Sequence, residues 1–109
     1  MSKNQERFLT LSDEEIITLA QNGDQEAVEF MTAKYFPHVR NKSRSYFLVG
    51  GDKEDIVQEG LIGLYEAIKD YSHDKQASFK TFMDICVTRQ IMTAIKTASR
   101  QKHIPLNTY

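Results

Sequence analysis

The residues best suited to chemistry form a row of cationic and hydroxyl side chains in the last quarter of the chain. The row consists of Arg89, Thr93, Lys96 and Arg100, which are separated by four, three and four positions. On an α-helix this spacing places them on one face. Lys and Arg neutralise phosphate charge and hydroxyl groups donate to phosphate oxygens, so such a face can bind a polyanion. The alternative is an ordinary solvated helix face.

Charge is distributed unevenly along the 109 residues, although the net charge is only −1. Residues 1–74 hold eight Lys/Arg and fourteen Asp/Glu, whereas residues 75–103 hold six Lys/Arg and one acid, Asp84. A basic segment on an acidic body indicates a polyanion at one end and a different partner at the other.

A second stretch, residues 52–70, reads as a helix with acidic and amide side chains. Asp55, Gln58, Glu59 and Ile62 share one broad face and combine charge, an amide group and apolar area, as protein interfaces do. Two glycines, at positions 60 and 63, each cost a helix about 1 kcal/mol relative to alanine. They therefore predict a close approach of the backbone to a neighbouring helix or to a partner.

Two further helices must support these elements. Ser12 and Glu15 form a capping-box pattern before a short helix that Gly23 ends, and Asp24 can cap the next helix. Pro37 predicts a break or kink, after which the helix resumes to about Phe47. The inward residues expected there are Val39, Tyr46 and Phe47.

Asp52 and Ser78 are the expected caps of the two helices that carry the chemistry. The last helix is predicted from about Phe79 to Gln101, and Ile104-Pro105 is expected to end it. No segment alternates like a strand, so we predict an all-α, compact bundle of four or five helices with no sheet. Residues 1–10 are expected to be a flexible tail.

Several classes of protein have no support. No apolar run approaches the roughly 18 residues of a membrane helix, and the first residues contain no secretory signal. The single cysteine, Cys86, suits a reducing cytoplasm. There is no phosphate-binding glycine loop, and the three histidines lie far apart. We therefore expect neither an enzyme nor a metal or cofactor.

Two blocks of sequence resemble a known family. Residues 54–65, Glu-Asp-Ile-Val-Gln-Glu-Gly-Leu-Ile-Gly-Leu-Tyr, resemble the region 2 helix of bacterial RNA polymerase sigma factors of the sigma-70 class. Ser78-Phe-Lys-Thr-Phe82 and the helix that leads to His103-Ile-Pro105 resemble the promoter-melting and −10-reading segments. Arg44-Ser-Tyr-Phe-Leu and the stretch from Thr88 to Asn107 are most similar to the sigma-H group, which serves transition-state and sporulation genes in low-GC Gram-positive bacteria.

The resemblance implies a sigma region 2 domain over residues 11–103 that binds core RNA polymerase and recognises and helps melt the promoter −10 element. Residues 104–109 would begin an interdomain linker, with the C-terminal domain or domains absent. The docking surface for a coiled coil of the largest polymerase subunit would comprise Asp55, Gln58, Glu59, Leu61, Ile62 and Tyr65.

The resemblance also assigns DNA contacts. Melting and base stacking would involve Lys75, Phe79, Lys80, Thr81 and Phe82, although for Phe79 core packing is an equal alternative. The duplex edge and the phosphates would meet Arg89, Met92, Thr93, Lys96, Arg100, Lys102 and His103. Ile85 and Cys86 stand where housekeeping members carry two tryptophans, so strong general melting is not implied.

The implied partners are core polymerase, the non-template strand of the −10 element and, in some members, an anti-sigma factor. A helical protein-interaction module that regulates transcription without touching DNA is the alternative function. Salt-independent or absent binding to −10 DNA would favour that alternative.

Overall fold

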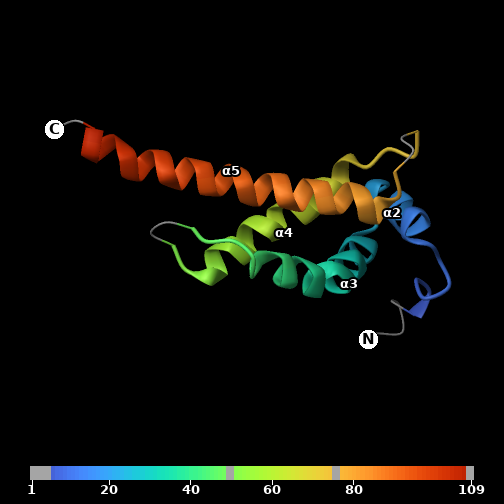
Figure 1. Ribbon diagram of the computed structural model, residues 1–109. Helices are drawn as coiled ribbons and strands as arrows, with labels where there is room; N and C mark the ends of the chain where they lie inside the picture. Colours follow the sequence, from blue (N-terminus) through green and yellow to red (C-terminus); the bar gives the residue numbers. More distant parts are fainter. Residues whose placement is uncertain (1–5, 49–50, 75–76, 108–109) are drawn as a thin grey trace.

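The computed structural model describes residues 6–48, 51–74 and 77–107, with side chains described as far as Arg100. The helices that form the bundle are α2 (Asp13–Gln21), α3 (Gln25–Ser43), α4 (Lys53–Asp70) and α5 (Phe79–Asn107) (Figure 1). The described residues contain no strand. The all-α prediction is therefore confirmed.

The predicted caps begin three of these helices. Ser12 Oγ accepts from the backbone N–H of Glu15, whose carboxylate accepts from Ser12 N–H. Asp52 and Asp55 form a second capping box at α4, and Asp24 accepts from Ala27 N–H at α3. Such caps each contribute about 1 kcal/mol because they satisfy backbone donors that have no partner within the helix.

Gly23 ends the α2 turn as expected, and its φ of 101° lies in the left-handed region that glycine tolerates. Gly23 N–H donates to Ala20 O at 3.1 Å, and Asp24 N–H donates to Leu19 O at 3.0 Å. These two bonds make a Schellman motif, which satisfies carbonyl groups at the end of the helix. The chain then turns directly into α3.

The core lies where α4 runs between α3 and α5 (Figure 1). Its largest fully buried side chains include Phe8, Ile16, Met31, Leu64 and Phe79, which come from every part of the bundle. The molecule measures 59 × 31 × 23 Å, and the long dimension follows α5, which projects past the other helices (Figure 1).

Both glycines of α4 make the close approaches that were predicted, and both are to neighbouring helices. A Cβ atom on Gly60 would lie 2.6 Å from Val39 Cγ1 of α3, and one on Gly63 would lie 2.7 Å from Val87 Cα of α5. The helices can pack this closely only because these positions lack a side chain.

Two predicted helix ends, near Phe47 and at Ile104-Pro105, were wrong, and the break predicted as one outcome at Pro37 does not occur. The helix α3 continues through Pro37 without a break. The carbonyl that loses its helical bond there belongs to Ala33, which is exposed, so water can satisfy it. The helix α3 ends at Ser43 rather than near Phe47. Of the residues expected to point inward, Val39 is buried and Tyr46 is half-buried, but Phe47 is 75% exposed.

The helix α5 extends past the predicted end at Ile104-Pro105, to Asn107. Pro105 falls in the last turn, where it removes only one helical bond. Residues 1–10 were expected to be a flexible tail, but Phe8 in that segment is 1% exposed and packs against Phe30, with ring centroids 5.1 Å apart. Residues 1–5 of the expected tail lie outside the described residues.

Candidate functional site

The outward face of α4 carries four of the six residues predicted to bind polymerase. Asp55, Gln58, Ile62 and Tyr65, which we call the α4 stripe, are spaced by three, four and three positions and are all exposed. Ile62 is 46% and Tyr65 57% exposed, so two large apolar side chains three positions apart lie on the same outward face. The stripe therefore offers apolar area flanked by polar groups.

The other two predicted residues lie at the margins of the α4 stripe. Glu59 is half-buried and turns toward α5, where its carboxylate accepts from Gln90 Nε2 at 2.8 Å. Leu61 is half-buried and packs against the core. Asp55 has a second role, because its carboxylate accepts from Asp52 N–H at 3.0 Å in the capping box.

The outward face of α5 carries the predicted basic row. Arg89, Met92 and Lys96 are exposed and follow Ile85, which is 48% exposed and lies on the same face. We call these four residues the α5 stripe; Thr93 and Arg100 are exposed beside it. Ile85 was not predicted as a surface residue, although its position four residues before Arg89 could have indicated it.

The aromatic residues at the start of α5 differ in exposure. Phe79 is fully buried, with its ring centroid 5.9 Å from that of Tyr35 and 5.6 Å from that of Tyr71. It cannot stack on a base in this conformation, so the stacking role assigned to it is corrected to core packing. Phe82 is half-buried, and its ring lies 5.7 Å from that of Tyr71.

Lys80 and Thr81 are both exposed beside this aromatic group. Thr81 N–H donates to Ser78 Oγ at 3.2 Å, which confirms Ser78 as a cap of α5. Lys75 lies outside the described residues, as do the side chains of Lys102 and His103. The roles predicted for those three residues are therefore not placed.

An ionic cluster joins α3 to α5 near this surface. The carboxylate of Asp84, the one acid of the basic segment, lies 2.8 Å from Lys42 Nζ and 2.8 Å from His38 Nε2. The hydrogen bond from Lys42 lowers the pKa of Asp84 below its usual value, with His38 acting in the same direction and burial opposing it. The cluster neutralises Asp84 beside the α5 stripe.

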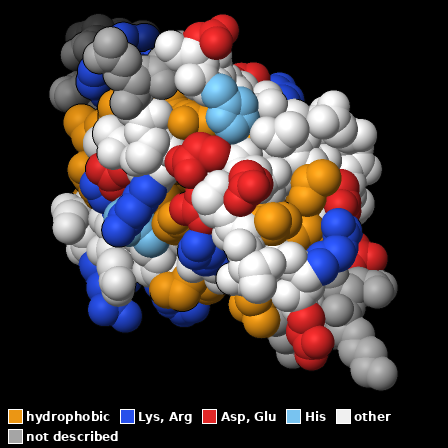
Figure 2. Space-filling view, turned by 90° about the vertical axis from the view of Figure 1, so that its right-hand side faces the viewer, with side chains coloured by type: hydrophobic (Ala, Val, Ile, Leu, Met, Phe, Trp, Pro, Cys, Tyr) orange, Lys and Arg blue, Asp and Glu red, His pale blue; other side chains and the backbone are white. Residues whose placement is uncertain are grey.

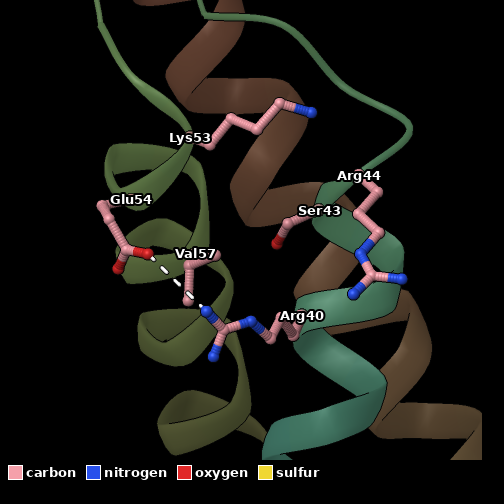
Figure 3. A pocket seen from close by; sticks show the side chains of 6 residues that line it. All are labelled: Arg40, Ser43, Arg44, Lys53, Glu54 and Val57. Carbon is pink, nitrogen blue, oxygen red and sulfur yellow. Dashed lines mark ion pairs between the residues drawn. The ribbon is translucent and has the colours of Figure 1, made fainter.

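A separate basic pocket of about 370 Å³ lies between α3 and α4. Its lining includes Arg40, Arg44 and Lys53, with Glu54 as the one carboxylate among the lining residues (Figure 3). Arg40 and Glu54 approach at 3.9 Å, and both side chains are more than half exposed, so their attraction is weak. Arg40 and Arg44 therefore line this pocket, whereas Lys42, which lies between them in the sequence, pairs with Asp84.

A metal site and a membrane-spanning helix are both absent from the part of the chain that the structure describes. No group of three or more His, Cys, Asp or Glu residues there could hold a metal ion. No helix there is long and apolar enough to cross a membrane.

Comparison with known proteins identifies the class to which this fold and these surfaces belong. Residues 31–101 match the family described as Sigma-70 region 2, and the chain therefore belongs to that family. Over 106 residues, which are 97% of the chain, it is 58% identical to the RNA polymerase sigma-H factors of Bacillus licheniformis and Bacillus subtilis (strain 168). The predicted resemblance to the sigma-70 class and its sigma-H group is confirmed.

More distant relatives include the RNA polymerase sigma factor SigA of a Bacillus species, which is 29% identical over 101 residues, or 92% of this chain and 27% of that protein. The chain spans about half the length of the sigma-H relatives, 48% and 49% respectively. No solved structure matches the chain. The expectation of a binding domain rather than an enzyme agrees with the family.

Proposed function

We propose that this domain binds core RNA polymerase through the α4 stripe and recognises and helps melt the promoter −10 element through α5. One observation carries the proposal: α4 and α5, which pack closely at Gly63, carry outward surfaces of different charge. The α4 stripe combines apolar groups with one acid, Asp55, whereas the α5 stripe combines apolar groups with two cations, Arg89 and Lys96. The contact of Gly63 with Val87 holds the two surfaces in one rigid unit.

On the polymerase side, Ile62 and Tyr65 are the anchors. Buried aromatic and large aliphatic side chains contribute most of the energy at protein interfaces, and both residues are already exposed for this purpose. Asp55 and Gln58 supply the polar rim. The partner would be the coiled coil of the largest subunit, by analogy with the family.

On the DNA side, Phe82 is the candidate for base stacking, which contributes about 1–3 kcal/mol for each base. Arg89, Met92 and Thr93 would face the upstream duplex edge of the element, whereas Lys96 and Arg100 would meet phosphate. Phosphate contacts provide affinity and salt dependence rather than sequence preference. The contacts predicted for Lys75, Lys102 and His103 stay predictions, because their side chains lie outside the described part of the structure.

The polymerase half of the proposal is tested by Ile62→Lys, measured as binding of the fluorescently labelled chain to purified core RNA polymerase. Loss of one anchor should weaken binding about tenfold or more. Leu9→Lys is the matched control, because Leu9 is 62% exposed and lies outside the α4 stripe. Equal binding by the two variants would contradict the proposed face, and absent binding by the unmodified folded chain would contradict polymerase binding itself.

The DNA half is tested with a single-stranded −10 oligonucleotide added to polymerase that carries this domain. Lys96→Ala should lower affinity and reduce the slope of log affinity against log salt by about 0.7 for one lost phosphate contact. Lys34→Ala is the control, since Lys34 is exposed on α3 and its ion pair is with Asp13. Salt-independent or absent binding to the −10 strand would favour the alternative, a helical protein-interaction module that regulates transcription without direct DNA contact.

The location and the use of the domain follow from the same proposal. A polymerase-binding domain would act in the cytoplasm, and a sigma-H-like protein would serve sporulation genes. An anti-sigma factor that masks the α4 stripe would be a further partner.

A further inference from the structure

One face of α2 contacts the end of α4, the loop that follows it and the start of α5. Glu14, Thr18 and Gln21 are spaced by four and three positions, so they lie on the same side of the helix. Each makes a hydrogen bond to a residue between Ile68 and Phe79. The helix α2 precedes residues 31–101, the part that matches the Sigma-70 region 2 family.

Gln21 caps the end of α4 from outside that helix. Its Nε2 lies 3.0 Å from Ile68 O and 2.9 Å from Tyr71 O, both within donating distance. Carbonyl groups in the last turn of a helix have no partner of their own within it. A side chain of α2 therefore supplies donors to the end of the helix that carries the α4 stripe.

Glu14 acts on the start of α5. Its Oε2 accepts from the backbone N–H of Phe79, the first residue of that helix, at 2.9 Å. A carboxylate at a helix N-terminus accepts a charge-assisted hydrogen bond from the backbone, and its negative charge also interacts favourably with the helix dipole. The helix that carries the basic stripe is thus anchored by a charged residue 65 positions away in the sequence.

The residues between these two anchors continue the network. Thr18 Oγ1 donates to Glu14 O at 3.1 Å, and it lies within hydrogen-bond distance of His73 Nε2, at 2.9 Å. The Tyr71 hydroxyl donates to Ala77 O at 2.9 Å, and the Tyr71 ring contacts Phe82. The network therefore ends on the aromatic residue proposed to stack on a base.

The surface at this end of the molecule is not a basic patch. Acidic side chains lie near its centre, with Lys and Arg beside them (Figure 2). Glu14 itself is half-buried and engaged with Phe79. A direct phosphate contact by this face of α2 is therefore disfavoured, and a role in positioning fits better.

We propose that Glu14, Thr18 and Gln21 of α2 are positioning residues, which hold the start of α5 and Phe82 at the place where an unstacked −10 base is bound. The inference rests on the proposed function. The loss of these bonds would weaken capture of the unpaired strand while leaving the α4 stripe, and hence polymerase binding, intact.

The test uses Glu14→Leu, Glu14→Gln and Thr18→Val in the complete chain bound to core polymerase. The first variant removes the acceptor for Phe79 N–H, the second keeps an acceptor without the charge, and the third removes only a hydroxyl group. Affinity for a −10 single strand should fall about tenfold for Glu14→Leu, about threefold for Thr18→Val and less than about threefold for Glu14→Gln. Affinity for polymerase should change less than twofold in all three variants, because substitutions far from the α4 stripe should act almost independently of it.

The control is Glu29→Leu, an exposed carboxylate on α3 away from this network, which should leave both affinities unchanged. Equal losses of polymerase and DNA affinity that track the loss of thermal stability would show a merely structural role and overturn the inference. Unchanged DNA affinity in Glu14→Leu would overturn it as well. If Glu14→Leu does not fold, Thr18→Val and Gln21→Met decide the matter, whereas failure of the unmodified chain to bind polymerase would reject the proposed function.

Discussion

Gly63 of α4 lies against the backbone of Val87 in α5, so close that a Cβ atom would stand 2.7 Å from Val87 Cα and 2.8 Å from Cys86 O. The contact is between two helix backbones, neither of which can move without shifting a whole helix. It therefore sets the distance between the surface proposed for polymerase and the surface proposed for DNA.

Gly63→Ala should destabilise the domain by about 1–3 kcal/mol, as overpacking of a core does, even though alanine favours a helix by about 1 kcal/mol over glycine. Chemical denaturation followed by circular dichroism would measure it. Gly60→Ala is the comparison, because its Cβ would meet the side chain of Val39 rather than backbone. It should cost less than Gly63→Ala, and the opposite order would show that α5 adjusts more easily than Val39.

Substitution of Phe79 should affect mainly the stability of the domain, whereas substitution of Phe82 should also weaken DNA binding. Phe79→Ala removes a fully buried ring and should cost about 3–5 kcal/mol of unfolding free energy. Phe82→Ala removes a half-buried ring, so about half that cost is expected, together with a loss of −10 strand affinity of about 1–3 kcal/mol. Thermal unfolding and oligonucleotide binding measure the two effects. A Phe82→Ala variant with unchanged affinity would remove this residue from the DNA surface.

Asp84 should make the stability of the domain depend on acid pH. Its pKa is lowered in the folded state, so its contribution is present above about pH 4, the pKa of an unfolded aspartate, and is lost as the pH falls through the lower folded pKa. Because the side chain is 40% exposed, Asp84→Asn should cost only about 0.5–1 kcal/mol at pH 7. The difference between the two proteins should disappear once the pH has fallen below the lowered folded pKa of Asp84, where its carboxyl group is protonated in both states. Urea unfolding over the acid range measures this, and a difference that does not change with pH would show that the ion pairs contribute nothing.

Ile85→Trp should strengthen promoter opening. Ile85 is 48% exposed on the α5 stripe, at a position where the resemblance places a tryptophan of the housekeeping members. A larger aromatic ring fits there without entering the core and adds stacking area at the upstream edge of the melted region. Fluorescence of 2-aminopurine in the −10 element would report opening by the domain with core polymerase. Glu29→Trp, at an exposed position on α3 outside both stripes, serves as the control and should have no effect.

Much of the local structure was predictable because its causes are local. The capping pairs at Ser12 and Asp52 each join residues three positions apart, and a periodicity of 3.6 identifies the inward side of α4. The exposed apolar residues Ile62 and Tyr65 were also predictable, since they fall outside that inward side. The family resemblance then assigned partners to these surfaces.

The tertiary structure decided whatever depends on residues distant in the sequence. Phe79 is buried because Tyr35 and Tyr71 enclose it, and a helix-start aromatic carries no sign of that in its neighbours. Phe8 belongs to the core although the segment around it is polar. The bond from Phe79 to Glu14 spans 65 positions, and such contacts form only when packing brings two helices together, so no local pattern can reveal them.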